Sequence, residues 1–204
     1  PPSYRALEEH TMTNTHIVTF TALLTLLLTP LSASSSESQS TSLWPTQTQS
    51  AHGYAIDFIR GEGAVNGIKL AYQYNIDQPL NVSWPMTLTM ETSANFWEYG
   101  DDNQYDSNVV LALSPILRFP LTTVFDKPID LELGIGVSLL DDTQFAGKDV
   151  STHYQFEDRI GFSTTFGQYQ EYRVSLRYFH YSNAGFKKPN PGLDFVSLSF
   201  SQRL

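Results

Sequence analysis

The sequence predicts an all-β fold, an eight-stranded antiparallel transmembrane β-barrel formed by residues 51–204. From residue 51 onward, apolar and polar side chains alternate with a period of two, and no segment has the 3.6-residue period of an amphipathic helix. Clusters of Gly, Pro, Asn and Asp divide this region into eight segments. Each segment has roughly the 9–11 residues that a tilted strand needs to cross a bilayer.

The composition of the chain excludes several functional classes. The chain has 204 residues, no cysteine and a formal charge of −9, and its length allows one sizeable domain. Without cysteine there is no disulfide scaffold, no thiol nucleophile and no cysteine-based metal site. The acidic balance offers no basic stripe to neutralise phosphates, so we expect no nucleic-acid partner.

A single long apolar run lies near the start of the chain. Residues 17–31, "IVTFTALLTLLLTPL", are shorter than the roughly 20 apolar residues of a spanning helix and are followed by "SASSS". We interpret the run as a secretory signal peptide that begins at Met12 and is cleaved near Ala33. A buried core helix is the alternative.

The chain therefore has three expected parts. Residues 1–33 hold upstream residues and the signal peptide. Residues 34–50 are rich in Ser, Thr and Gln and predict a flexible leader. Residues 51–204 form the barrel.

The first four expected strands cover residues 53–61, 67–76, 86–97 and 107–119. Each sets large apolar side chains on one face against polar side chains on the other. The apolar faces carry Tyr54, Ile56, Phe58, Ile68, Leu70, Tyr72, Tyr74, Met86, Leu88, Met90, Phe96, Val109, Leu111, Leu113, Leu117 and Phe119. The opposite faces carry Asp57, Lys69, Gln73, Glu91, Asn95, Ser114 and Arg118.

The last four expected strands cover residues 128–140, 153–166, 170–182 and 193–204. Their apolar faces carry Ile129, Leu131, Leu133, Ile135, Val137, Leu139, Tyr154, Phe156, Ile160, Phe162, Phe166, Tyr172, Val174, Leu176, Tyr178, Val196, Leu198 and Phe200. The polar faces carry Asp130, Glu132, Ser138, Glu157, Arg159, Ser163, Arg173, Ser175, Arg177, Ser197, Ser199 and Ser201. The alternation thus continues to the end of the chain.

The connections and the charges decide between two kinds of barrel. Longer loops follow the odd strands and generally shorter turns follow the even ones, which is typical of an outer-membrane barrel. A soluble barrel would turn its charges outward, whereas a membrane barrel turns them into its interior. The polar faces hold five acidic and five basic side chains, as a packed, ion-paired interior requires. With eight strands that interior is filled by side chains, so we do not expect a porin.

A candidate site lies in the last hairpin. His180 and Ser182 continue the outward register of the seventh strand, and Asp194 shares the outward face of the eighth. Neighbouring strands lie about 4.7–4.9 Å apart, so the three side chains can meet. Histidine would act as the base for a serine nucleophile, and the aspartate would orient the imidazole. Amides in "SNAG" and "NPG" could donate to an oxyanion, and the outward position suits a substrate embedded in the bilayer.

The stretch "RYFHYSNAGFKKPNPGLDFVSL" resembles the signature of the outer-membrane lipid A 3-O-deacylases. Residues 154–167, "YQFEDRIGFSTTFG", resemble the sixth strand of that family. The resemblance implies a barrel that hydrolyses the ester-linked acyl chain at position 3 of lipid A in lipopolysaccharide. It also implies His180 as base and Ser182 as nucleophile. The same resemblance implies oxyanion-hole roles for Asn183, Gly185 and Asn190.

The chain departs from the family pattern at two positions. Asp194 stands where the family usually has glutamate, so its carboxylate is one methylene shorter. The chain also ends in Leu204, where barrels usually end in an aromatic residue.

The position of Asp158 is not explained by the pattern, because strict alternation turns it outward, toward lipid. Either a bulge rotates it inward or it supports the site.

The expected partners follow from this reading. They are lipid A or lipopolysaccharide as substrate, the surrounding outer-membrane lipid, and a second copy of the chain in a homodimer. No metal-ligand spacing is present, and we expect no cofactor. Two alternatives remain open, an outer-membrane phospholipase and a non-catalytic barrel.

Overall fold

The computed structural model describes residues 50–76, 85–100 and 106–204. The expected signal peptide and nearly all of the expected leader lie outside these residues. Eight long strands form the barrel: β1 (His52–Gly61), β2 (Asn66–Ile76), β3 (Thr87–Tyr99), β4 (Asp106–Val124), β5 (Lys127–Leu140), β8 (Tyr154–Phe166), β9 (Tyr172–Ser182) and β10 (Leu193–Arg203). Within the described ranges, no helix is long and apolar enough to cross a membrane.

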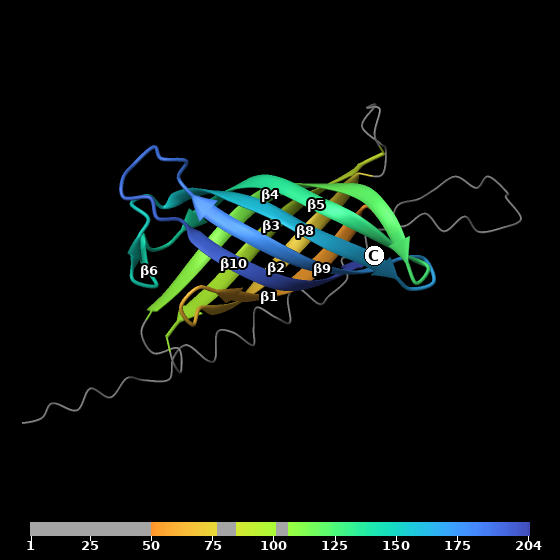
Figure 1. Cartoon of the computed structure of the whole chain (residues 1–204), viewed down its shortest axis with the longest axis horizontal. Coiled ribbons are helices and arrows are strands. Elements are labelled where there is room, and N and C mark those ends of the chain that lie inside the picture. The colour runs from red at the N-terminus through yellow and green to blue at the C-terminus, as the bar shows by residue number, and fades with distance from the viewer. Residues whose placement is uncertain (1–49, 77–84, 101–105) are drawn as a thin grey trace, which may run out of the picture. The chain divides into compact units, whose positions relative to one another are not determined.

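The strands close into one barrel in the order β1-β10-β9-β8-β5-β4-β3-β2. Every neighbouring pair is antiparallel, and β1 closes the barrel by pairing with β10 from Gly53↔Arg203 to Gly61↔Phe195. Figure 1 shows the strands running obliquely around the barrel, with the β9–β10 loop at one end and the C-terminus at the other. The predicted eight-stranded antiparallel barrel is confirmed. We call the end that carries the β9–β10 loop the long-loop end.

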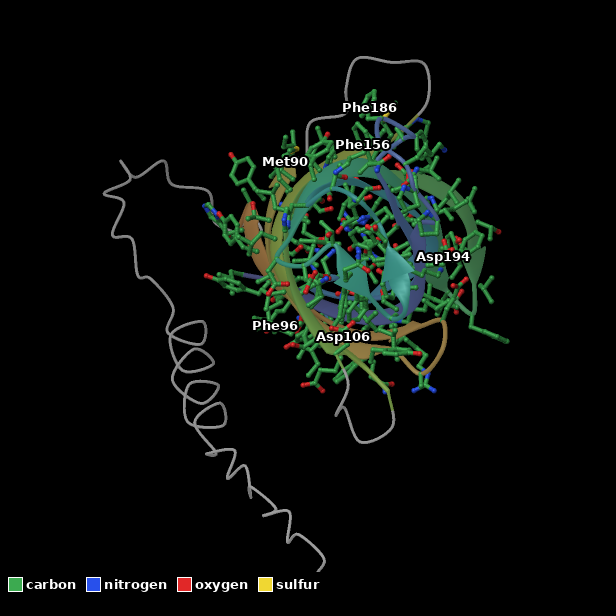
Figure 2. The ribbon with its side chains drawn as sticks, turned by 90° about the vertical axis from the view of Figure 1, so that its left-hand side faces the viewer. Met90, Phe96, Asp106, Phe156, Phe186 and Asp194 are labelled. Carbon is green, nitrogen blue, oxygen red and sulfur yellow. The ribbon has the colours of Figure 1, made fainter. Side chains whose placement is uncertain are left out.

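The charged side chains face the interior, as the alternation predicts. Arg177 donates to Glu132 at 2.6 Å and to Asp57 at 3.1 Å in the centre of the barrel. Figure 2, a view turned by 90°, shows the interior filled with side chains. The ten inward charges are Asp57, Glu91, Asp130, Glu132, Glu157, Lys69, Arg118, Arg159, Arg173 and Arg177, all buried or half-buried. Burial of charge is tolerated here because each group has a partner of opposite sign.

An aromatic cluster fills the interior at the long-loop end. The Trp97 ring lies 4.4 Å from that of Phe195 and 4.9 Å from that of Tyr181, centroid to centroid. Phe145 and Phe179 pack against the same cluster, and all five side chains are almost fully buried. These inward rings hold β9 and β10 in place at the long-loop end, where the candidate site lies.

Two connections differ from the sequence-based prediction. Residues 120–127 read as a loop in the sequence, but β4 continues to Val124 and a two-residue turn follows. Phe125 and Asp126 have φ values of 48° and 60°, the left-handed pair that a tight hairpin turn needs. The loop before β8 contains a short hairpin, β6 (Gln144–Phe145) and β7 (Lys148–Asp149), because Phe145 inserts into the aromatic cluster.

Candidate active site

The candidate site occupies the outer face of the β9–β10 hairpin at the long-loop end. The register sets His180 directly opposite Asp194 on β10. Alternation along the strands keeps both side chains outward, because their neighbours Tyr181, Leu193 and Phe195 are buried in the aromatic cluster. The inward packing of these neighbours therefore fixes the outward direction of the site.

His180 and Asp194 are joined by a hydrogen bond. The Nδ1 atom of His180 lies 2.7 Å from Oδ1 of Asp194, and their side chains are 36% and 25% exposed. With Nδ1 donating its proton to the carboxylate, the imidazole presents Nε2 as an acceptor. This is the tautomer that a general base needs.

Gly192 packs against the face of this imidazole. It has a φ of +71°, and a Cβ built there would lie 2.5 Å from Cε1 of His180. The left-handed backbone and the close approach both require glycine. The end of the β9–β10 loop therefore limits where the ring of His180 can move.

Ser182 lies two residues beyond His180 on the same outward face of β9. Its neighbour across the β8–β9 pair is Phe156. Within the described part of the chain its hydroxyl has no hydrogen-bond partner, so neither Ser182 nor Nε2 of His180 is committed elsewhere. A serine at i+2 is the next residue on the same face of the strand that carries the imidazole.

The amide groups of the β9–β10 loop are used mainly to hold the loop. Asn183 is almost fully buried, and its Nδ2 donates to the carbonyl oxygens of Val150 and Lys187 at 3.2 Å and 3.0 Å. Its Oδ1 accepts from the Gly185 amide at 2.9 Å. Asn190 accepts from the Asn183 amide through Oδ1 at 3.1 Å. The Nδ2 group of Asn190 donates to no atom of the described residues.

The site has an apolar side and a polar side. Ser182, Phe156, Val137 and Leu113 follow one another across β9, β8, β5 and β4 as outward cross-strand neighbours. The exposed ring of Phe186 lies 6.2 Å from that of Phe156, and Figure 2 shows both outside the barrel wall. An apolar surface therefore begins beside Ser182.

The polar side adjoins Asp194. A cavity of about 270 Å³ is lined by Asp194, Tyr99, Glu62 and Lys148 among others. Lys148 pairs with Glu62 at 2.5 Å and donates to the carbonyl oxygen of Gly192 at 3.1 Å. Charged and apolar surroundings thus meet at the hairpin, as at the rim of a bilayer.

Residues 66–203 match the family model described as "Lipid A 3-O-deacylase (PagL)". The chain belongs to this family. It is therefore an outer-membrane β-barrel enzyme, an ester hydrolase that acts on lipid A.

Curated relatives and a solved structure agree with this assignment. The chain is 30% identical over 156 residues to the lipid A deacylase PagL of Pseudomonas aeruginosa, covering 74% of this chain and 87% of that protein. It is 38% identical over 116 residues to the lipid A deacylase PagL of Bordetella bronchiseptica, and this match spans 57% of the chain and 62% of the relative. A crystal structure of the outer-membrane enzyme PagL superposes with a TM-score of 0.64 at 21% identity. That structure is matched over 99% of its length and this chain over 74%, which supports the fold.

Asp158 belongs to the surroundings of the PagL-type site. Its strand β8 pairs with β5 and β9 without a register shift, so no bulge turns it inward. It lies directly opposite His180, on the side away from Asp194. His180 therefore stands between two outward carboxylates, of which Asp194 is hydrogen-bonded to it.

The structure also brings forward residues that the sequence reading did not single out. Tyr178 was expected only as an outward aromatic side chain, but its hydroxyl donates to Oδ1 of Asp194 at 2.5 Å. Gly192 was noted only as part of "NPG", although glycine is the residue type expected where the backbone takes a positive φ or approaches another group closely. The i−2 spacing of Tyr178 from His180 was the one available sign that it lies beside the site.

Proposed function

We propose that this chain hydrolyses the ester-linked 3-hydroxyacyl chain at position 3 of lipid A, with Ser182 as nucleophile, His180 as base and Asp194 as orienting acid. The observation that carries the proposal is the 2.7 Å contact between Nδ1 of His180 and Oδ1 of Asp194. It lies on the lipid-facing wall, two residues from Ser182, in a member of the lipid A 3-O-deacylase family.

In the first half of the reaction, Oγ of Ser182 attacks the ester carbonyl carbon while its proton passes to Nε2 of His180. Asp194 stabilises the imidazolium that forms, through the Nδ1 hydrogen bond. The tetrahedral intermediate then collapses, the bond to the sugar oxygen breaks, and His180 returns the proton to that oxygen. The products of this half are 3-O-deacylated lipid A and an acyl ester on Ser182.

In the second half, water replaces the sugar hydroxyl. His180 takes a proton from the water as its oxygen attacks the acyl carbon on Ser182. Collapse of the second intermediate releases the 3-hydroxy fatty acid, and the proton on His180 returns to Oγ of Ser182. The enzyme ends in its starting state without a cofactor.

An oxyanion develops in both halves and needs hydrogen-bond donors. Of the three residues that the resemblance implies, Asn190 is the best-supported donor, because its Nδ2 group is uncommitted within the described residues. Asn183 and Gly185 support this donor indirectly, because their amide groups form the hydrogen bonds that hold the loop carrying Asn190. We assign Asn183 and Gly185 to this supporting role.

The surroundings of the site match the two ends of the substrate. The apolar row that begins at Phe156 runs sideways from Ser182, where an acyl chain emerging from the bilayer would lie. The cavity beside Asp194 includes the charged side chains of Glu62 and Lys148 in its lining, and these suit the sugar end of lipid A. A homodimer stays a prediction.

The test is incubation of the detergent-solubilised chain with purified lipopolysaccharide and, separately, with phospholipid vesicles, followed by mass spectrometry of the lipids. We expect loss of one 3-hydroxyacyl chain from lipid A and no such loss with Ser182→Ala. Lysophospholipid release with intact lipid A would support a phospholipase instead. Identical lipid A profiles with the wild type and the Ser182→Ala variant would support a non-catalytic barrel.

A further inference from the structure

We infer that Tyr178 is a positioning residue, whose hydroxyl holds the short Asp194 carboxylate in line with His180. This inference rests on the proposed function, and it assigns Tyr178 a part in the same reaction. The hydroxyl of Tyr178 donates to Oδ1 of Asp194 at 2.5 Å. The same oxygen accepts from Nδ1 of His180 at 2.7 Å.

The register explains how the tyrosine reaches the acid. Tyr178 faces Val196 across the β9–β10 pair, whereas Asp194 faces His180. Tyr178 and Asp194 are therefore diagonal neighbours on one face, with Cα atoms separated by about 7–8 Å, a span within reach of an aromatic side chain. The outward cross-strand neighbours of Tyr178 are Ile160 on β8 and Val196 on β10.

The acid needs such a partner because it is short and lies on the lipid-facing wall. An aspartate carboxylate turns about a single Cβ–Cγ bond and cannot extend to meet the imidazole as a glutamate can. A carboxylate at the edge of an apolar environment is also costly unless it is hydrogen-bonded. An ionised carboxylate has about four acceptor positions on its two oxygens, so one oxygen can accept from both Tyr178 and His180. Two donors that converge on Oδ1 fix the plane of the carboxylate.

The consequence for the reaction lies in the imidazole. An aspartate held in place keeps the proton of His180 on Nδ1 and leaves Nε2 toward Ser182. Without the tyrosine hydroxyl, the carboxylate can rotate and hydrate, and the correct orientation of the imidazole is populated less often. Substrate binding does not pass through this contact, so the effect falls on kcat and leaves KM nearly unchanged.

The decisive variant is Tyr178→Phe, which keeps the ring and removes only the hydroxyl. A hydrogen bond to a charged group contributes enough free energy that its removal should lower kcat on lipid A by about tenfold. The matched control is Tyr172→Phe, on the same strand and face, where the hydroxyl has no partner among the described residues and the ring stacks on Phe166. We expect the control to keep wild-type kcat and KM. Far-ultraviolet circular dichroism establishes that each variant retains the barrel.

The length of the Asp194 side chain gives a second test. In an Asp194→Glu background the longer side chain reaches His180 by its own flexibility, so we expect removal of the Tyr178 hydroxyl to change kcat by less than about twofold. A tenfold loss in both backgrounds would show that the tyrosine does not act by compensating for the short acid. A kcat for Tyr178→Phe within twofold of wild type would overturn the inference altogether.

A spectroscopic arm separates this inference from the proposed function. The proton on Nδ1 of His180 is followed by nuclear magnetic resonance and assigned by its absence in His180→Asn. We expect faster exchange with water in Tyr178→Phe than in the wild type and in Tyr172→Phe. Equal exchange in all three would contradict the positioning role, even where lipid A is hydrolysed. Altered exchange without hydrolysis of lipid A would leave the positioning role standing and refute the proposed function.

Discussion

The interior of the barrel and its outer wall both hold carboxylates that contact nitrogen-containing side chains, but the two kinds of pair have different roles. Inside, Glu91 lies 2.8 Å from Nζ of Lys69 and 2.9 Å from Nη2 of Arg159, and all three side chains are fully buried. Outside, Asp194 contacts His180 and both side chains remain partly exposed. An arginine guanidinium keeps its proton, whereas an imidazole is a side chain that can both accept and donate one. The inner pairs therefore hold the fold, and the outer pair is able to move protons.

The comparison is tested most strongly by Ser182→Ala on the outer wall. Loss of the nucleophile should lower lipid A hydrolysis by about a thousandfold or more, because the imidazole then has no hydroxyl to activate. The free energy of unfolding should not change, since the hydroxyl has no partner among the described residues. Hydrolysis rates and urea unfolding of the same preparation check both expectations. A variant with substantial activity would show that the nucleophile is a different residue.

Glu91→Gln tests the interior. The change leaves Lys69 and Arg159 short of a counter-charge in a fully buried place, and Gln73 also donates to this carboxylate. We expect the free energy of unfolding to fall by about 3–5 kcal/mol, with hydrolysis per folded molecule nearly unchanged.

The matched control for Glu91→Gln is Glu62→Gln, which breaks the exposed pair with Lys148. Its expected cost is at most about 1 kcal/mol. Equal costs for the two variants, measured by urea unfolding, would contradict the division between inner and outer pairs.

Gly192→Ala sharpens the comparison by displacing the imidazole of the outer pair. The added methyl group would lie 2.5 Å from Cε1 of His180, so the ring must turn away from Asp194 or Ser182. We expect kcat to fall by about a hundredfold, the size of effect that a displacement of about 1 Å produces.

Gly147→Ala controls for backbone strain in that experiment. Gly147 has a φ of +72°, close to that of Gly192, and nothing lies within 4 Å of a Cβ built there. The control should lose some stability and little activity. Similar kinetic losses in both glycine variants would assign the effect to the backbone and not to His180.

Asp158→Asn should have the smallest effect. Its carboxylate lies opposite His180 without a hydrogen bond within the described residues, and acts only through its charge. Such a half-buried surface charge is worth about 1 kcal/mol to a nearby imidazolium, or roughly fivefold in kcat. Steady-state kinetics on lipid A would measure it. A loss of a hundredfold or more would make Asp158 the orienting acid.

The fold could be predicted from the sequence because successive side chains of a strand point to opposite faces of the sheet. An alternation of apolar and polar residues therefore shows which face is inward. The burial of Glu91, Arg159 and Arg177 follows from their position in that alternation. The connection at 120–127 was predicted too long, because Phe125 is not a residue type that favours the positive φ of a two-residue turn, although Asp126 tolerates it. The short β6–β7 hairpin was missed because it depends on Phe145 reaching a distant aromatic cluster.

The candidate site was only partly accessible from the sequence. His180, Ser182 and Asp194 could be placed on one face by counting residues along two strands. The contact of Tyr178 with Asp194 could not, because it is a diagonal contact and depends on the register of the hairpin. The approach of Gly192 to the imidazole depends on the path of the loop, which no periodic pattern encodes.

The most direct test of the central claim, that the outer wall of this hairpin carries an activated serine, is covalent labelling with a long-chain alkyl fluorophosphonate. Oγ of an activated serine attacks the phosphorus and displaces fluoride, and peptide mass spectrometry then locates the adduct. The account predicts one adduct, on Ser182, which disappears in His180→Ala although Ser182 is still present. An adduct on another residue, or labelling of Ser182 that is unaffected by loss of His180, would contradict it.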